Sequence, residues 1–529
     1  MRSEVPWWQR GVVYQVYPRS FADSDSDGVG DLAGITGRLD HLAALGVDAV
    51  WLSPIFRSPM RDFGYDVADY RDVDPVFGTL EDADRLIAAA HERGIRVVLD
   101  FVPSHTSSDH PWFLDARSSR DAEHRDWYVW RDPAHDGGPP NDLVAQFGGP
   151  AWTLDEHTGQ YWYHSFLPEQ PDLDWSNPAV RAAMHDNLRF WFDRGVDGFR
   201  IDVLWMIAKD DAPWRDGPVT DAPTGFGGDP RNALEHGDGP ATDERLLELR
   251  AVADEYPDRV LIGEVYMEPR RMVRYYGPGG RGAHLPFNTA LVTLPWQADE
   301  IRAAIEACEA ALPDRAWPNW VLGNHDQSRV ATRLGPAQAR VAAMLLLTLR
   351  GTPTLYYGDE LGLPDVAVPP GRVVDVAGRD PERSPMPWTT GPNAGFTGGA
   401  PWLPITDDPG TFSVEAQERD PGSMLALHRR LLVLRRAEPA LHLGSWTGLE
   451  APAGVVAYER EHGGTRFLVL LNVTGNPAPV LLDGAWAIEL STGLDREPGV
   501  PAGPTVELRA DEGMILRAGA RPRAAAALR

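Results

Sequence analysis

Four carboxylates stand at the ends of short apolar runs: Asp100 in Asp-Phe-Val-Pro-Ser-His, Asp202 in Asp-Gly-Phe-Arg-Ile-Asp, Glu264 in Gly-Glu-Val-Tyr and Asp326 in Gly-Asn-His-Asp. Cleavage of a glycosidic bond needs an acid that protonates the leaving oxygen and a carboxylate that faces the cation-like sugar carbon, and a close pair implies double displacement with retention. A single such carboxylate is more often a solvated strand end or a helix cap. Four together, with Arg200 on the same strand face as Asp202, favour glycoside chemistry.

The elements that position these carboxylates follow from an alternation of apolar runs and amphipathic stretches. Eight runs predict strands at Val12–Tyr17, Ala49–Pro54, Arg96–Pro103, Gly198–Val203, Val260–Tyr266, Pro286–Val292, Trp320–Asn324 and Thr354–Tyr357. Helical spacing of apolar residues predicts helices at Ala33–Leu45, Leu80–Arg93, Pro178–Arg194, Asp243–Tyr256, Ala298–Leu312 and Ala337–Arg350. Eight such units predict an α/β fold, a (β/α)8 TIM barrel with its active site at the carboxyl ends of the strands.

Two long polar stretches interrupt this alternation. Residues 104–177 are rich in Trp, His, Asp and Gly and are far longer than a normal βα connection, so we expect an inserted lobe over the barrel mouth. A second insertion, rich in Pro and Gly, spans about residues 363–411. The catalytic barrel is therefore expected in residues 1–103 and 178–442, followed by an antiparallel β-sandwich in 443–519 and a tail in 520–529.

Composition narrows the class of ligand. The chain of 529 residues has 50 Lys and Arg against 77 Asp and Glu, a formal charge of −27, which disfavours nucleic acid and anionic membranes and suits a small neutral substrate. Its longest apolar run, Val341–Leu349, is about half the roughly 20 residues that span a bilayer. Residues 2–8 lack the apolar core of a secretory signal, and Cys308 has no partner for a disulfide, so a cytoplasmic location is expected. The oligomeric state stays open.

The carboxylate segments resemble the four sequence regions of the α-amylase family of glycoside hydrolases in order and spacing, from Val12 to about Leu361. The segment Gln170-Pro-Asp-Leu-Asp-Trp175 resembles a further motif of the α-glucosidase and oligo-1,6-glucosidase branch. Tyr17-Pro-Arg-Ser-Phe21 and Gly378–Trp388 are similar to that branch as well. The resemblance thus covers most of the chain, and the C-terminal segment is its least specific part.

The resemblance implies a role for each catalytic carboxylate. Asp202 attacks the anomeric carbon, Glu264 protonates the leaving oxygen and later acts as base, and Asp326 stabilises the distorted sugar. A nucleophile must stay ionised, so we expect Arg200 to lower the pKa of Asp202, whereas Glu264 must hold a proton in a drier setting. The two carboxyl groups are expected about 5–5.5 Å apart.

The resemblance also implies a closed pocket for one terminal glucose. Tyr65 matches a stacking platform, and Asp62 matches the carboxylate that binds sugar hydroxyls at the closed end, which favours exo action. The remaining expected sugar-binding residues are His105, Phe147, Phe166, Gln170, Arg200, His325 and Arg379. The family usually has Asn where this chain has Ser104, and the shorter side chain leaves a gap or admits a water. Val203 resembles the residue of enzymes that tolerate α-1,6 links, yet linkage stays open.

A separate acidic loop runs from Asp23 to Asp31. Alternate acids around Gly28 are hard-cation ligands wrapped round a turn, similar to an EF-hand loop without its terminal Glu, although such loops are more often plain polar turns. The resemblance implies structural Ca2+ and no organic cofactor. The implied ligands are the carboxylates of Asp23, Asp25, Asp27 and Asp31 and the carbonyl of Val29.

These features together predict a retaining, exo-acting α-glucosidase that hydrolyses short α-glucosides and oligosaccharides through a covalent glucosyl-enzyme. An α-glucosyl transferase, or an isomerase that acts on sucrose or trehalose, would use the same intermediate, and the sequence does not separate these readings. A non-catalytic binding subunit of amylase-like architecture is a remote alternative, because such subunits lack parts of the catalytic set and carry a membrane anchor. An endo-acting amylase is disfavoured by the closed pocket end.

Overall fold

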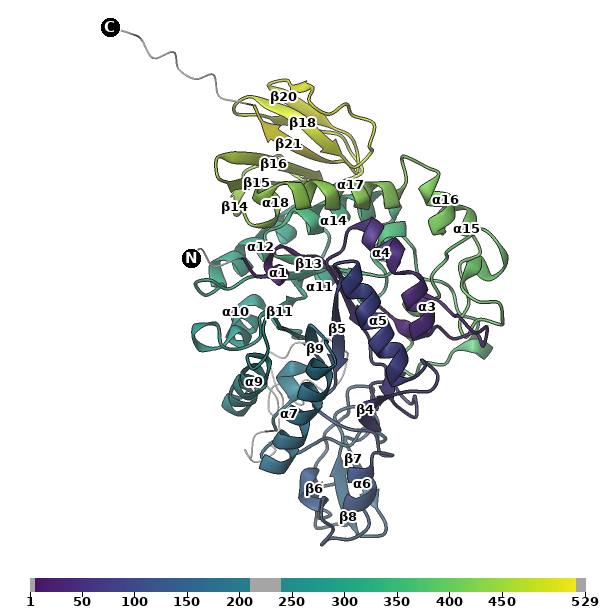
Figure 1. Ribbon diagram of the computed structural model, residues 1–529. Helices are drawn as coiled ribbons and strands as arrows, with labels where there is room; N and C mark the ends of the chain where they lie inside the picture. The colour runs from purple at the N-terminus through teal and green to yellow at the C-terminus, as the bar shows by residue number, and fades with distance from the viewer. Residues whose placement is uncertain (1–4, 210–238, 520–529) are drawn as a thin grey trace.

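A computed structural model describes residues 5–209 and 239–519, and eight parallel strands close into a barrel at its centre (Figure 1). In their order around the barrel the strands are β1 (Val13–Val16), β13 (Thr352–Tyr356), β12 (Asn319–Val321), β11 (Leu285–Asn288), β10 (Val260–Gly263), β9 (Gly198–Ile201), β5 (Arg96–Phe101) and β2 (Ala49–Leu52). Each corresponds to a predicted strand, so the predicted barrel is confirmed. The sixth ends earlier than expected, because Asn288 Oδ1 accepts a hydrogen bond from Ala290 N and α11 (Ala290–Thr293) begins there.

Both faces of the barrel strands are buried, as their continuous apolar sequences require. Val13, Trp51 and Phe287 belong to the core inside the barrel. Tyr14 and Val50, one position along their strands, belong instead to the core between strands and helices. This alternation directs one set of side chains inward at every strand, so a residue at a strand's carboxyl end can reach the barrel mouth.

The predicted helices are present, and local side-chain bonds explain their ends. Thr79 and Asp82 form a reciprocal capping box at the start of α5, and Asn177 caps α7 ahead of Pro178. The expected helix at 33–45 is split at Arg38, which has non-helical ψ near 2°. The helices are α1 (Trp7–Arg10), α2 (Pro18–Phe21), α3 (Leu32–Gly37), α4 (Leu39–Leu45), α5 (Leu80–Glu92), α6 (Pro111–Ala116), α7 (Pro178–Asp193), α9 (Pro240–Ala253), α10 (Pro269–Met272), α11, α12 (Ala298–Ala311), α13 (Val330–Leu334), α14 (Pro336–Thr348), α15 (Pro409–Phe412), α16 (Val414–Glu418), α17 (Met424–Ala437) and α18 (Pro439–His442).

The segment between β5 and β9 forms a separate small body. It holds α6 and a three-stranded antiparallel sheet of β6 (Trp130–Arg131), β8 (Gln160–Tyr163) and β7 (Trp152–Asp155) around its own apolar cluster. A bridge between His105 and Asp172 ties its two ends together, so the segment leaves and re-enters the barrel at one place. A second short hairpin, β3 (Phe56–Arg57) with β4 (Asp69–Val73), lies beside it (Figure 1).

The chain ends in antiparallel strands at the opposite end of the molecule from this small body (Figure 1). A six-stranded sheet runs β14 (Ser445–Leu449), β15 (Val455–His462), β16 (Thr465–Asn472), β21 (Gly513–Ala518), β18 (Trp486–Ser491), β19 (Pro501–Ala502), and β17 (Ala478–Leu481) pairs with β20 (Thr505–Leu508). Leu470 faces the smaller sheet, as in a sandwich, whereas Ile515 faces the core of the barrel helices. The expected tail at 520–529 lies outside the described residues. In residues 5–209 and 239–519 no helix is long and apolar enough to span a membrane.

Candidate active site

Three of the predicted carboxylates converge on one buried guanidinium at the carboxyl ends of β5, β9 and β10. Arg200 pairs in register with Asp100 across β9 and β5, and its Nη1 donates to Asp100 Oδ1 at 2.8 Å and to Asp202 Oδ1 at 2.7 Å. Its Nη2 lies 2.8 Å from Glu264 Oε1 as an ion pair without hydrogen-bond geometry. The strands continue the ladder here, since Asp202 N donates to Phe101 O and Glu264 N to Ile201 O. The barrel therefore brings Asp202 and Glu264 to the same cation.

Burial dominates the charge state of these carboxyls. It raises the pKa of Glu264 to about 7 against the opposing effect of Arg200, which suits a group that must donate a proton near neutrality. Burial also raises the pKa of Asp202, and Arg200 offsets only part of that effect. Arg200 thus lowers the pKa of Asp202, as expected, but burial outweighs that effect. Asp202 accepts a hydrogen bond from Arg200, whereas Glu264 does not. The geometry therefore makes Asp202 the ionised member of this pair of carboxyl groups.

Val203 holds the second oxygen of Glu264. Its backbone N donates to Glu264 Oε2 at 2.7 Å, and its own backbone is left-handed, with φ 35° and ψ 50°. A β-branched residue in that region costs about 1–3 kcal/mol, a strain that concentrates at functional sites. Both Glu264 oxygens thus face donors, which fixes the carboxyl relative to Asp202.

Asp326, after β12, lies among cations that keep it ionised. Its Oδ1 accepts hydrogen bonds from Arg379 Nη1 at 2.9 Å and from Arg383 Nη2 at 3.0 Å, and its Oδ2 lies 3.3 Å from His325 Nε2. Burial alone would raise the pKa of Asp326, but His325 and the two arginines lower it well below its ordinary value. Asp326 is thus a fixed negative charge in the same cavity as Asp202 and Glu264.

A cavity opens above these groups. Its walls include the three catalytic candidates and most of the predicted sugar-binding residues: Asp62, Tyr65, His105, Phe147, Phe166, Asp202, Val203, Glu264, His325, Asp326 and Arg379. Tyr65 stacks on His325 with ring centroids 5.3 Å apart and donates its hydroxyl to Asp100 at 2.9 Å. The predicted site residues from distant segments therefore form one pocket.

A polar network joins Asp62 and Arg379, which both line this cavity, to Gln170. Asp62 Oδ2 accepts from Gln170 Nε2 at 3.0 Å, and Asp62 Oδ1 accepts from Arg379 Nη2 at 2.7 Å. Gln170 Nε2 also lies 3.2 Å from His105 Nε2. Asp62 and Arg379 come from segments 317 residues apart, so neither the barrel strands nor local sequence alone forms this part of the pocket wall.

Sequence reasoning missed three residues that support the site. Lys209 Nζ donates to Ser104 Oγ at 3.0 Å and pairs with Asp172 at 2.7 Å, so an ammonium group fills the space expected to be a gap beside Ser104. Arg383 and Asp375 support Asp326 and Arg379 from the segment after β13. Arg383 stood within the Gly378–Trp388 motif, but Lys209 and Asp375 carry no sequence signal of their own.

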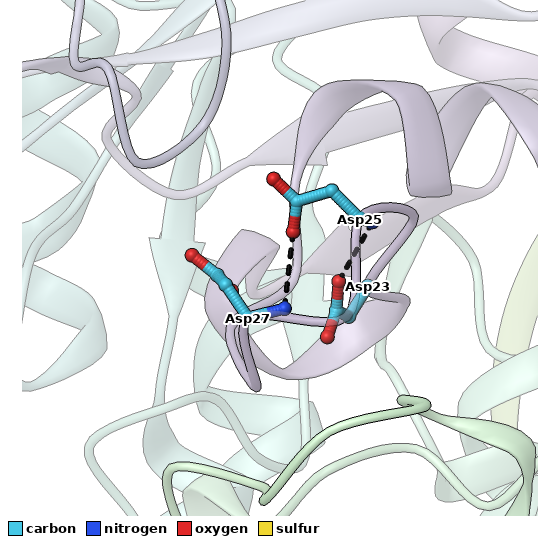
Figure 2. A group of neighbouring side chains, drawn as sticks. All are labelled: Asp23, Asp25 and Asp27. Carbon is cyan, nitrogen blue, oxygen red and sulfur yellow. Dashed lines mark hydrogen bonds between the residues drawn. The ribbon is translucent and has the colours of Figure 1, made fainter.

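The acidic loop after β1 brings together three of the four predicted carboxylates. Ligand oxygens of Asp23, Asp25 and Asp27 lie within 4.8 Å of one another, and Figure 2 shows the three side chains around the turn. Asp31 is not in this group: its Oδ1 accepts from Gly34 N at 2.6 Å and caps α3, and its Oδ2 accepts from Ser24 N at 2.7 Å. Val29 donates its N–H to Asp27. The cluster thus presents carboxylate oxygens, the donors that a hard cation prefers, without Asp31 in the group.

Comparisons with known proteins agree with this geometry. The family model described as the α-amylase catalytic domain matches residues 15–444. The chain belongs to the α-amylase family of glycoside hydrolases. It is 42% identical to a probable α-glucosidase of Rhizobium meliloti (strain 1021) over 89% of this chain and 90% of that protein, and 35% identical to an oligo-1,6-glucosidase of Parageobacillus thermoglucosidasius over 88% and 90%. A solved α-glucosyl transfer enzyme superposes with a TM-score of 0.91 at 40% identity, covering 98% of this chain and all of that one.

Proposed function

We propose that the protein is a retaining, exo-acting α-glucosidase that releases the terminal glucose of short α-glucosides and oligosaccharides. The observation that carries the proposal is the meeting of Asp202 and Glu264 on Arg200 beneath a cavity whose far end Asp62 and Arg379 close. A closed end admits the non-reducing terminus of a chain and excludes its interior. The names of the two curated relatives, an α-glucosidase and an oligo-1,6-glucosidase, support the same reading.

The arrangement supplies both halves of a double displacement. Glu264, protonated by virtue of its raised pKa, donates its proton to the glycosidic oxygen while Asp202 forms a bond to the anomeric carbon and the aglycone leaves. Glu264, now ionised, takes a proton from water, and that water displaces Asp202 with a second inversion. Asp326 and Tyr65 contact the sugar ring, which is positively charged and flattened at each transition state.

A second candidate uses the same intermediate. The solved α-glucosyl transfer enzyme shares the whole fold, which supports transfer of the glucosyl group to another sugar or alcohol in competition with water. Product analysis separates the two: maltose, isomaltose, sucrose and trehalose are supplied singly, and free glucose, new oligosaccharides and the first anomer are followed. Early release of α-glucose supports the retaining hydrolase, new disaccharides support a transferase or isomerase, and no cleavage of any of them would overturn both.

We further propose that the loop of Asp23, Asp25 and Asp27 binds Ca2+ and stabilises the fold after β1. Three carboxylates within 4.8 Å repel one another, and a bound divalent cation would offset that repulsion. Added Ca2+ is expected to raise the melting temperature of chelator-treated protein, and Asp25→Asn is expected to abolish the rise. Asp40→Asn, which changes an exposed carboxylate outside the loop, serves as the control. An equal rise in all three proteins would contradict the site.

A further inference from the structure

Asp375 lies behind the sugar pocket in the segment that follows β13, and it is only 3% exposed. Its Oδ2 accepts from the backbone N of Arg379 at 2.7 Å and from Arg379 Nε at 3.0 Å, and its Oδ1 accepts from Arg379 Nη2 at 2.7 Å. Asp375 is not one of the described residues that line the cavity. It therefore binds Arg379 from the side that faces away from the cavity.

The opposite side of Arg379 faces the pocket. Its Nη1 donates to Asp326 and its Nη2 to Asp62, two carboxylates that line the cavity, and its guanidinium lies 5.0 Å from the ring centroid of Phe147. A guanidinium is planar, so a carboxylate that binds Nε and Nη2 together fixes the whole plane. Without Asp375, Arg379 would keep its charge but lose the paired hydrogen bonds from Nε and Nη2 that set its orientation toward Asp62 and Asp326.

Asp375 is itself held in place by its own segment. Asp380 Oδ2 accepts from the backbone N of Val374 at 2.7 Å and of Asp375 at 3.1 Å, so the chain is folded back on itself between Asp375 and Asp380. Arg383, which also binds Asp326, lies 3.6 Å from Asp375 Oδ1. Two arginines thus share one buried carboxylate on the side away from the cavity.

We propose that Asp375 is a positioning residue, and that by orienting Arg379 it sets the closed end of the pocket and hence the affinity for the terminal glucose. This inference rests on the proposed function and names the residue that supports its exo specificity. The hydrogen bonds and ion pairs of Asp375 within the described residues reach Arg379 and Arg383 but neither Asp202 nor Glu264, so its removal loosens sugar binding and leaves the proton and nucleophile chemistry in place.

The test compares Asp375→Asn with wild type on maltose and isomaltose. An amide of the same shape cannot accept both charged hydrogen bonds from Arg379. The loss of one such interaction corresponds to roughly a tenfold rise in KM. The value of kcat is expected to change less than about threefold, and the alkaline limb of the pH profile is expected to stay. Asp155→Asn is the matched control, because Asp155 is equally buried and pairs with Arg117 away from the pocket.

A double-mutant cycle keeps the proposal falsifiable even if Asp375→Asn lowers stability. In an Arg379→Lys background these paired hydrogen bonds are already lost, so adding Asp375→Asn is expected to raise KM no further, whereas two independent, additive rises would overturn the positioning role. An unchanged KM in Asp375→Asn of wild-type fold would overturn it as well. Wild-type protein that cleaves no α-glucoside would instead refute the proposed function, so the two failures are distinguishable.

Discussion

Replacing Glu264 with glutamine removes the proton that the leaving oxygen needs and keeps the shape of the side chain. In wild type, Val203 N donates to Oε2 while Oε1 lies beside Arg200 Nη2. The amide oxygen of Glu264→Gln can satisfy one of these donors, so the fold and the pocket are expected to persist. The expected defect is therefore one of chemistry rather than of binding.

The size of the defect follows from the role of a general acid. Proton transfer of this kind contributes about 10²- to 10⁴-fold in rate, equivalent to about 3–5 kcal/mol of barrier. With maltose, kcat of Glu264→Gln is expected to fall by that factor. With α-glucosyl fluoride, whose leaving group needs little protonation, the first step is expected to survive and glucosyl-enzyme to accumulate, because the general base for water is also missing.

The pH dependence gives an independent check. The acid works in its protonated form, and burial raises the pKa of Glu264 to about 7, so kcat/KM of wild type is expected to fall as pH rises through about 7. Glu264→Gln has no such group and is expected to lose that alkaline limb. Stopped-flow and steady-state assays from pH 5 to 9 measure both effects. Equal losses on maltose and the fluoride, or an alkaline limb that persists in the variant, would refute the assignment.

Three further predictions concern the nucleophile and the fold. Asp202→Asn is expected to lower kcat by about 10⁴-fold or more while calorimetry still detects sugar binding, and full activity would refute the nucleophile assignment. Thr79→Ala removes the hydroxyl that caps α5 and is expected to cost about 1 kcal/mol in urea unfolding, with Thr36→Ser, which keeps its hydroxyl, as the unaffected control. Ile515→Ala opens a cavity between β21 and the barrel helices and is expected to cost about 2–5 kcal/mol, seen as a lower denaturation midpoint; an unchanged midpoint would show that the two parts do not share a core.

The catalytic carboxylates could be placed from the sequence because parallel strands have a built-in direction. Asp202 and Glu264 directly follow β9 and β10, and the carboxyl ends of neighbouring parallel strands meet at one rim. Helix spacing and cap residues likewise predicted α5 and α7 to within a residue or two. These features are local, so local sequence carries them.

Contacts between distant loops were decided only by the tertiary structure. Loops have no periodicity, so nothing in the sequence places Asp375 behind Arg379 or makes Asp31 the cap of α3. The net pKa of Asp202 could not be predicted for a related reason, because the adjacent Arg200 is visible in the sequence but the burial that outweighs its effect is not. The sequence by itself thus determined which groups are proposed to perform the chemistry, whereas packing decided their protonation and which distant segments line the pocket, since burial depends on every segment that surrounds a group.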